Sequence, residues 1–250
     1  MLVIKIGGST LGAHDTSLDD IAALHKEGRE IVVVHGGGAT ISEWLARHGV
    51  PSRFERGLRV TDEATLDVVV AVLAGLVNKR LVAELQARGA RATGLSGADR
   101  AIIRAHRYDP ALGFVGEVVA VDAGVLRKEA QDAVVVLAPI AIEDGAAQLL
   151  NVNADTAAGE VAAALSAERL VFLTDVPGVM DASGAVRAQL SADEARGLIA
   201  DGTVSAGMIP KVESALRAAS AGVPATICDG REAGALRSVL AGESLGTRIA

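Results

Sequence analysis

The sequence predicts an α/β fold with an open, mainly parallel central sheet that is sandwiched by helices. Two observations lead to this prediction. Short apolar runs rich in β-branched residues alternate with longer helical segments, and hydrophobic residues make up 50% of the chain against only 2% aromatic residues. Buried parallel strands are built from Val, Ile and Leu, so this composition favours a parallel sheet over an aromatic-rich β-sandwich. With 250 residues, the chain can also bury a substantial core.

The predicted strands are six apolar runs, at residues 2–6, 30–35, 90–95, 133–137, 170–173 and 225–228. Segments that we interpret as helices separate most of them, at residues 18–27, 39–48, 63–75, 79–88, 155–165, 192–201 and 208–221. Four of these helices are followed by a glycine, as is typical of a C-terminal cap: Gly28, Gly49, Gly89 and Gly222. The alternation predicts right-handed βαβ units.

The middle of the chain shows a different pattern. Residues 101–106 and 113–121 flank the turn-prone Tyr108-Asp109-Pro110, which predicts an antiparallel hairpin beside the main sheet. No repeat or flexible linker divides the sequence, so we expect two continuous lobes, residues 1–154 and 155–250. In an open sheet of this kind, ligands bind beyond the carboxyl ends of the strands.

Composition also excludes several classes of function. A net charge of -7 and a pI near 5.3 argue against binding to a phosphodiester backbone, which needs clustered Lys and Arg. Cys228 is the only cysteine, so neither an intramolecular disulfide nor a thiolate zinc cluster is expected. No signal peptide is recognisable, and no apolar stretch approaches the roughly 18 residues of a membrane span. We therefore expect a cytoplasmic protein with no nucleic-acid or membrane partner.

Two glycine-rich segments follow predicted strands. In Lys5-Ile6-Gly7-Gly8, glycine N–H groups could approach phosphate oxygens beside a lysine charge, although a tight turn is an equally good interpretation. The segment matches neither a Walker loop nor a Rossmann fingerprint, which removes the main support for a nicotinamide enzyme. In His35-Gly36-Gly37-Gly38, glycines at a helix N-terminus suit an anion, whereas His35 itself is more simply a structural hydrogen-bonding residue.

Polar residues in three further segments could bind ligands. Arg59 offers a planar fork for a carboxylate, and the alternative interpretation is a surface residue beside a Thr-Asp helix cap. Asn151, Asn153 and Asp155 occupy alternate positions that face the same way in an extended chain, and one of them is expected to cap the following helix. Lys211 lies at the start of a predicted helix, where its positive charge opposes the helix dipole. Helix stability alone therefore does not account for a lysine at this position.

Together and in this order, these motifs resemble the amino acid kinase family, most closely its acetylglutamate kinases. The most specific parts are Gly-Leu-Arg-Val-Thr at residues 57–61, Asn-Val-Asn-Ala-Asp-Thr at 151–156, Leu-Thr-Asp-Val-Pro-Gly-Val at 173–179 and Gly-Met-Ile-Pro-Lys-Val at 207–212. The resemblance implies an enzyme that transfers the γ-phosphoryl group of ATP to the side-chain carboxylate of N-acetyl-L-glutamate. It also implies that the N-terminal lobe binds the acyl substrate and dimerises, while the C-terminal lobe binds ATP.

The same resemblance assigns roles to individual residues. Lys5 and Lys211 would straddle the γ-phosphoryl group, with Asp155 holding both ammonium groups. The acyl substrate would be bound by Gly37, Gly38, Arg59, Asn151 and Asn153. ATP would be bound by Gly7, Gly8, Asp175, Val176, Pro177, Gly178, Val179, Met180, Thr203, Val204 and Ser205. Mg²⁺ would be held mainly by the ATP phosphates and water, without a protein ligand.

Two alternatives remain open at the level of sequence. Residues 75–80 also resemble kinases of lysine biosynthesis that act on aminoadipate attached to an acidic carrier protein, which an acidic enzyme would repel unless a basic patch compensated. A non-catalytic amino-acid or nucleotide sensor on the same fold would have lost Lys5, Asp155 or Lys211, and all three are present. The loop at residues 96–100 departs from the pattern of the relatives, so its role in the site is open.

The resemblance further suggests an isologous homodimer that L-arginine does not inhibit. Arginine-sensitive members carry an extra N-terminal helix, whereas this sequence opens directly with its first strand. The predicted dimer surface lies within residues 63–88, where the apolar residues outnumber those that one sheet face should need: Leu66, Val69, Val70, Leu73, Leu76 and Val77.

Overall fold

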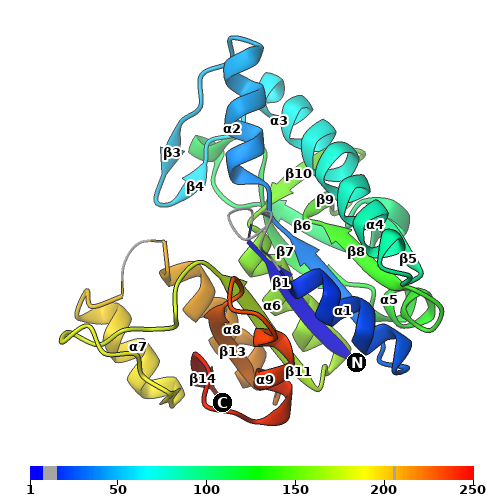
Figure 1. The fold of residues 1–250 in the computed structure, drawn as a ribbon. Helices are drawn as coiled ribbons and strands as arrows, with labels where there is room; N and C mark the ends of the chain where they lie inside the picture. The colour runs from blue at the N-terminus through cyan, green and yellow to red at the C-terminus, as the bar shows by residue number, and fades with distance from the viewer. Residues whose placement is uncertain (8–15, 205–206) are drawn as a thin grey trace.

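A mainly parallel sheet forms the centre of the molecule. The computed structural model describes residues 1–7, 16–204 and 207–250. Within these ranges the sheet has eight strands in the order β12-β14-β13-β11-β1-β2-β8-β5 (Figure 1). Their bounds are β1 (Leu2–Ile6), β2 (Ile31–His35), β5 (Ala92–Ser96), β8 (Val134–Ala138), β11 (Arg169–Thr174), β12 (Gln189–Leu190), β13 (Ala225–Asp229) and β14 (Thr247–Ile249). Every neighbouring pair is parallel except β13 and β14, which confirms the predicted fold class.

Apolar layers on the two faces of this sheet form the core. Side chains alternate along a strand, so Val3 faces one layer while Leu2 and Ile4 face the other. The layer of Val3 is covered by α5 (Ala123–Ala130), α6 (Ala154–Leu165), α7 (Ala192–Ala200) and α8 (Ile209–Ser220). The opposite layer is covered by α1 (Ser17–Lys26), α2 (Gly38–Arg47), α3 (Glu63–Val70), the π-helix η1 (Ala71–Val77), α4 (Asn78–Ala87) and α9 (Ala235–Ala241). The predicted sandwich of helices around a sheet is therefore confirmed (Figure 1).

The six predicted strands all form, each within two residues of its expected bounds. The four glycines expected after helices have φ between 69° and 84°, as left-handed C-terminal caps require: Gly28, Gly49, Gly89 and Gly222. Strand β1 lies between β2 and β11, so strands that come later in the chain lie on both sides of it. This arrangement opens a crevice at the carboxyl end of β1, next to Lys5.

The prediction of two separate helices, at residues 63–75 and 79–88, is wrong. The structure has one helical run over residues 63–87, with η1 in its middle. The expected break falls next to Asn78, which is buried and donates from Nδ2 to the carbonyl oxygens of Val136 at 2.9 Å and Leu95 at 3.2 Å. These bonds to neighbouring strands fix a residue with modest helix propensity inside a helix.

The apolar surface proposed for dimer formation is smaller than the sequence suggests. Leu66, Val69, Leu73 and Val77 are at most 6% exposed and belong to the core of this chain. Val70 and Leu76 are half-buried. The correction arises because this helical run packs not only on the sheet but also on α1 and α2, so more of its circumference is covered.

A smaller group of strands lies beside the main sheet. Strands β6 (Ile103–Arg107) and β7 (Val115–Val121) form the predicted antiparallel hairpin, and they close with β9 (Ile140–Glu143) and β10 (Leu149–Val152) into a small barrel. Strands β3 (Phe54–Glu55) and β4 (Leu58–Arg59) form a separate two-stranded hairpin. Short 3₁₀ turns occur at η2 (Asp99–Ala101) and η3 (Pro110–Leu112).

Several of these elements are not predicted by the sequence patterns: α5, α9, β3, β4, β9, β10, β12 and β14. Most are two to four residues long, which is too short for periodicity to be recognised. None of the helices in the described ranges has the length and apolarity that a membrane span needs.

Candidate active site

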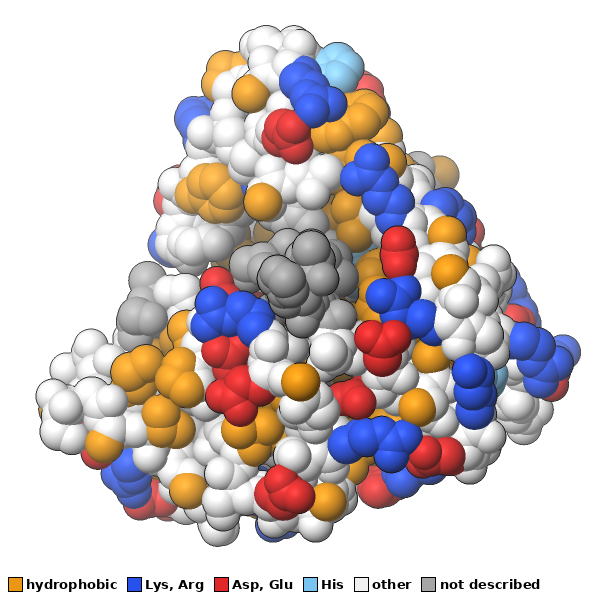
Figure 2. All heavy atoms as spheres, in the orientation of Figure 1, with side chains coloured by type: hydrophobic (Ala, Val, Ile, Leu, Met, Phe, Trp, Pro, Cys, Tyr) orange, Lys and Arg blue, Asp and Glu red, His pale blue; other side chains and the backbone are white. Residues whose placement is uncertain are grey.

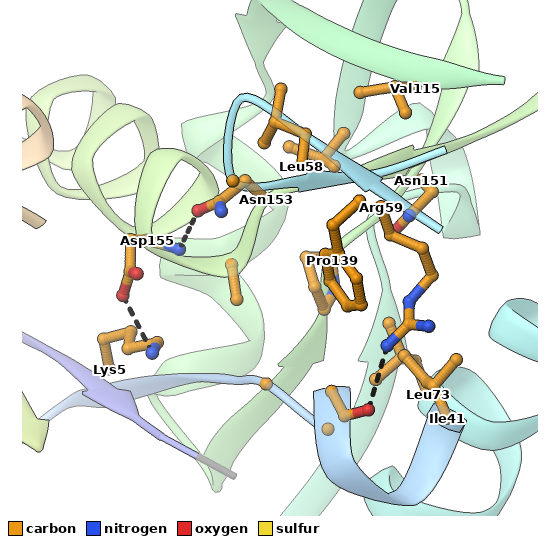
Figure 3. Close-up of a pocket in the computed structure, with 17 residues that line it drawn as sticks. Lys5, Ile41, Leu58, Arg59, Leu73, Val115, Pro139, Asn151, Asn153 and Asp155 are labelled. Carbon is orange, nitrogen blue, oxygen red and sulfur yellow. Dashed lines mark hydrogen bonds and ion pairs between the residues drawn. The ribbon is translucent and has the colours of Figure 1, made fainter. Parts of the chain in front are cut away.

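A cavity of about 220 Å³ lies beyond the carboxyl ends of β1, β2 and β8. It contains seven of the residues singled out in the sequence: Lys5, Gly37, Gly38, Arg59, Asn151, Asn153 and Asp155. Figure 3 shows Lys5 and Asp155 on one side of this cavity and Arg59 and Asn151 on the other. The position agrees with the expectation that an open parallel sheet binds its ligands at this edge.

Two lysines share one carboxylate at the edge of the cavity. Lys5 Nζ lies 2.8 Å from Asp155 Oδ1, and Lys211 Nζ lies 3.2 Å from Asp155 Oδ2. Burial raises the pKa of Asp155, but the charges of Lys5 and then Lys211 outweigh it, so the pKa is held below its usual value. Asp155 therefore stays ionised between the two ammonium groups.

Helix α6 positions Asp155 within its first turn. Asn153 is the N-cap, and its Oδ1 accepts from the N–H groups of Asp155 at 2.8 Å and Thr156 at 3.1 Å. The expected capping role in this segment thus belongs to Asn153. A carboxylate in the first turn also interacts favourably with the helix dipole.

Lys211 reaches the cluster because α8 packs closely on α6. A Cβ atom at Gly159 of α6 would lie only 2.8 Å from the carbonyl oxygen of Ser214 of α8, so a larger residue would separate the helices. Lys211 Nζ also lies 3.3 Å from the carbonyl oxygen of Gly207. The lysine that opposes its own helix dipole is thus compensated by a carboxylate from a neighbouring helix.

The guanidinium group of Arg59 is held on several sides. Nη1 donates to Ser52 Oγ at 2.5 Å, and Nη2 donates to the Gly38 carbonyl and to Ser42 Oγ, both at 3.0 Å. The ring of Phe54 lies 4.6 Å from the guanidinium carbon. Burial lowers the pKa of Arg59 from its usual value. The interpretation as a surface residue is wrong, because Arg59 is only 7% exposed and lines the cavity.

Gly37 and Gly38 bring backbone N–H groups to the cavity at the start of α2. A Cβ atom at Gly37 would meet Leu73 Cδ2 at 2.7 Å, so a larger residue there would displace this side chain of η1. The Gly36 N–H is already used, because it donates to the Ile6 carbonyl at 3.0 Å. Among the described residues, none accepts from the N–H groups of Gly37 and Gly38, which leaves them for an anionic ligand.

His35 has the structural role that the sequence favours. It is fully buried, and it does not line the cavity. Its Nδ1 lies 3.0 Å from the Gly36 carbonyl, which can only accept, and its Nε2 lies 3.3 Å from the amide nitrogen of Asn78. Burial lowers the pKa of His35 to about 4. The imidazole is therefore neutral at physiological pH, with its proton on Nδ1.

The residues assigned to ATP lie apart from this cavity. Residues 175–180 follow β11, and Thr203 and Val204 lie between α7 and α8. Val179 and Val204 belong to the apolar core, so only their backbone could contact a nucleotide. Gly7 N–H donates to the Leu173 carbonyl at 3.2 Å, at the end of β11. Gly8 and Ser205 lie outside the described residues.

The sequence patterns do not single out several residues of the site. Ser42, Ser52 and Phe54 hold Arg59, and Leu73 reaches the cavity from η1. Of these residues, only Ser52 and Phe54 lie within ten residues of Arg59, so only these two could have been suggested by the motif around Arg59.

The loop at residues 96–100, whose role the sequence leaves undecided, is held by Asp99. Its Oδ2 accepts from the N–H of Ser96 at 2.6 Å and from the Ser96 hydroxyl at 2.9 Å. This loop does not line the cavity.

Comparisons with known proteins identify the same family as the sequence motifs. The model of the amino acid kinase family matches residues 1–229. An acetylglutamate kinase of Dehalococcoides mccartyi (strain ATCC BAA-2266 / KCTC 15142 / 195) is 47% identical over 92% of this chain and 87% of its own length. One of Cereibacter sphaeroides (strain ATCC 17029 / ATH 2.4.9) is 46% identical over 100% and 87%. A crystal structure from Streptococcus mutans UA159 has a TM-score of 0.86 and 31% identity, and covers 99% of this chain and 97% of that one. The chain therefore belongs to the amino acid kinase family.

Proposed function

We propose that this protein is an acetylglutamate kinase. It transfers the γ-phosphoryl group of ATP to the side-chain carboxylate of N-acetyl-L-glutamate and forms N-acetyl-L-glutamyl 5-phosphate, a step of arginine biosynthesis. The observation that carries the proposal is the Lys5-Asp155-Lys211 cluster at the edge of a cavity that also contains Arg59. Relatives 46–47% identical over nearly the whole chain bear this name.

The cluster suits phosphoryl transfer to a carboxylate. An ionised carboxylate is already a nucleophile, so the reaction needs no general base. Its obstacle is the repulsion between this carboxylate and the triphosphate, which alignment and preorganised positive charge overcome. Lys5 and Lys211 supply that charge, and Asp155 fixes the position of both ammonium groups.

The opposite side of the cavity binds the rest of the acyl substrate in this proposal. Arg59 takes the α-carboxylate, because its guanidinium is fixed in place before the ligand arrives. The N–H groups of Gly37 and Gly38 hold the reacting carboxylate near Lys5, and Asn151 contacts the groups around the α-carbon. Asn153 contributes indirectly by capping α6. Residues 1–154 thus form the acyl-binding lobe.

ATP binds to the lobe of residues 155–250, beyond the end of β11 and next to residues 175–180 and 203–205. The donor set near the cluster suits a magnesium ion that is carried by the nucleotide. Among the described residues that line the cavity, only Asp155 has a carboxylate, and both of its oxygens already face ammonium groups. Mg²⁺ would reduce the charge of the triphosphate, and water and phosphate oxygens would supply its ligands.

Two further parts of the proposal concern the whole protein. We place it in the cytoplasm, where ATP is available. We also propose a homodimer through the outer face of the helical run at residues 63–87, where Val70 and Leu76 remain half-buried in the single chain. Light scattering of purified protein would test this, because a monomer at micromolar concentration would contradict it.

Trapping of the acyl phosphate tests the activity directly. Purified protein with Mg-ATP and N-acetyl-L-glutamate should form a hydroxamate in the presence of hydroxylamine. L-Glutamate and L-aminoadipate at the same concentration test the substrate, and Lys5→Ala protein serves as the inactive control. Turnover of another acid without acetylglutamate would contradict the substrate assignment, and absence of turnover with all three would contradict kinase activity on these acids.

A further inference from the structure

Thr61 connects two residues of the proposed acyl site although it does not line the cavity itself. It is fully buried, and its hydroxyl donates to the Arg59 carbonyl at 2.8 Å while accepting from Asn151 Nδ2 at 3.1 Å. Its backbone is fixed as well: Thr61 N–H donates to the Leu112 carbonyl at 2.9 Å, and Phe114 N–H donates to the Thr61 carbonyl at 2.7 Å. Thr61 is therefore anchored to β4 and to the small barrel at the same time.

These bonds determine which way the Asn151 amide faces. A hydroxyl has one hydrogen, and the Arg59 carbonyl takes it because a carbonyl can only accept. Thr61 Oγ1 must then accept from Asn151, which turns the amide nitrogen toward Thr61. The reversed amide would place Asn151 Oδ1 against the buried Thr61 Oγ1. Two acceptor oxygens would then face each other, at a substantial cost in free energy.

The remaining acceptor of Asn151 is its Oδ1. No residue in the described ranges donates to this atom, and Asn151 lines the cavity opposite the Lys5-Asp155 pair (Figure 3). In an N-acyl amino acid, the α-carboxylate and the amide N–H are attached to the same carbon. A ligand whose carboxylate is bound by Arg59 therefore presents its N–H within reach of a neighbouring residue such as Asn151.

We infer that Thr61 is a positioning residue that sets Asn151 Oδ1 to accept from the acylamide N–H of the substrate. The inference rests on the proposed function, since it concerns the same acyl site. It makes Thr61 a determinant of specificity, because a site with a preset acceptor rejects an isostere that places an oxygen there. The matched isostere is 2-acetoxyglutarate, in which an ester oxygen replaces the N–H of N-acetylglutamate.

Steady-state kinetics of Thr61→Val and Thr61→Ser test this role. Valine keeps the shape of threonine but removes the hydroxyl, whereas serine keeps the hydroxyl. Thr61→Val should raise the KM for N-acetyl-L-glutamate about 10-fold and leave the KM for ATP within about two-fold, since one buried hydrogen-bond partner is lost on the acyl side only. Thr61→Ser should stay close to wild type. The ratio of kcat/KM for N-acetylglutamate to kcat/KM for 2-acetoxyglutarate should be smaller in Thr61→Val than in the wild-type protein.

Controls separate this role from a general loss of structure. Thr226→Val removes another buried hydroxyl, on β13 and away from the cavity, and should leave both KM values unchanged. Should Thr61→Val not fold, Thr61→Cys replaces it, because a thiol is a weak hydrogen-bond partner. Wild-type KM values in the hydroxyl-free variant, or an unchanged preference over the ester, would overturn the inference. Failure of the wild-type protein to phosphorylate acetylglutamate would instead overturn the proposed function and this inference with it.

Discussion

The carboxylate of Asp155 lies 2.8 Å from the ammonium group of Lys5, with only 9% and 7% of the two side chains exposed. Lys211 approaches the other carboxylate oxygen at 3.2 Å. One anion therefore separates two cations and keeps them apart at a fixed spacing. The cluster retains one net positive charge, which a transferring phosphoryl group can use as its own negative charge shifts.

Replacing Lys211 should affect turnover more than nucleotide binding. Lys211→Ala should lower kcat by roughly 10²–10³, the usual cost of losing one preorganised donor in the transition state, with a much smaller rise in the KM for ATP. Lys128→Ala, which removes an exposed lysine from α5, is the matched control. Near-normal kcat in folded Lys211→Ala protein would refute the catalytic role of this residue.

Neutralising Asp155 should destabilise the protein as well as inactivate it. Asp155→Asn leaves the buried Lys5 without its counter-charge, and breaking such a buried pair costs roughly 3 kcal/mol of unfolding free energy. Urea unfolding at pH 7 measures this. The control is Glu43→Gln, which removes an exposed ion pair with Arg47 and should change the unfolding free energy by less than about 1 kcal/mol. Equal stability of both variants would mean that Lys5 finds another partner.

Arg59→Lys should weaken binding of the acyl substrate alone. A lysine has one ammonium group, so it cannot reproduce the fork that contacts Ser52, Ser42 and the Gly38 carbonyl. We expect the KM for N-acetyl-L-glutamate to rise by about 10-fold or more, with the KM for ATP nearly unchanged. Exposed Arg53→Lys is the control. If the acyl KM stays at the wild-type value, another residue must bind the α-carboxylate.

Much of the fold could be predicted because its strands are short, apolar and buried on both faces. Parallel strands such as β1 and β8 are therefore recognisable as continuous β-branched runs. The π-helix η1 could not be predicted, because its apolar sequence also suits an ordinary helix. What fixes the helical run there is the set of bonds from Asn78 to β5 and β8, which depends on the tertiary structure.

The candidate site could be predicted as a set of residues but not as an arrangement. Strand ends, glycines and helix starts identified Lys5, Asp155 and Lys211 separately. Their contact depends on the packing of α6 against α8, which brings together residues 56 positions apart. Likewise, Thr61 and Asn151 are 90 positions apart, and local sequence patterns carry no information about such a bond. The roles of Lys5, Asp155, Lys211 and Asn151 came from the family resemblance rather than from spacing.

The last prediction concerns His35, whose burial makes folding stability depend on pH. Its pKa is about 4 in the folded protein against an ordinary value of 6.5, because burial disfavours the charged ring. The unfolded chain therefore takes up this proton at a higher pH than the folded protein does. The contribution of His35 to stability is complete above about pH 6.5 and is lost progressively as the pH falls toward 4, with a total of about 3 kcal/mol.

Urea unfolding of wild-type protein and His35→Asn between pH 7.5 and about 4.5 isolates this contribution. The variant should be less stable at pH 7.5, because Asn78 and the Gly36 carbonyl lose their partner. As the pH falls, the wild type should lose stability faster than the variant, since only the wild type has this proton to take up. Asp155, whose pKa is lowered in the folded protein, does not interfere, because both proteins contain it and its contribution is common to the two stability curves. Parallel stability curves for the two proteins would show that the imidazole is not held neutral by the fold.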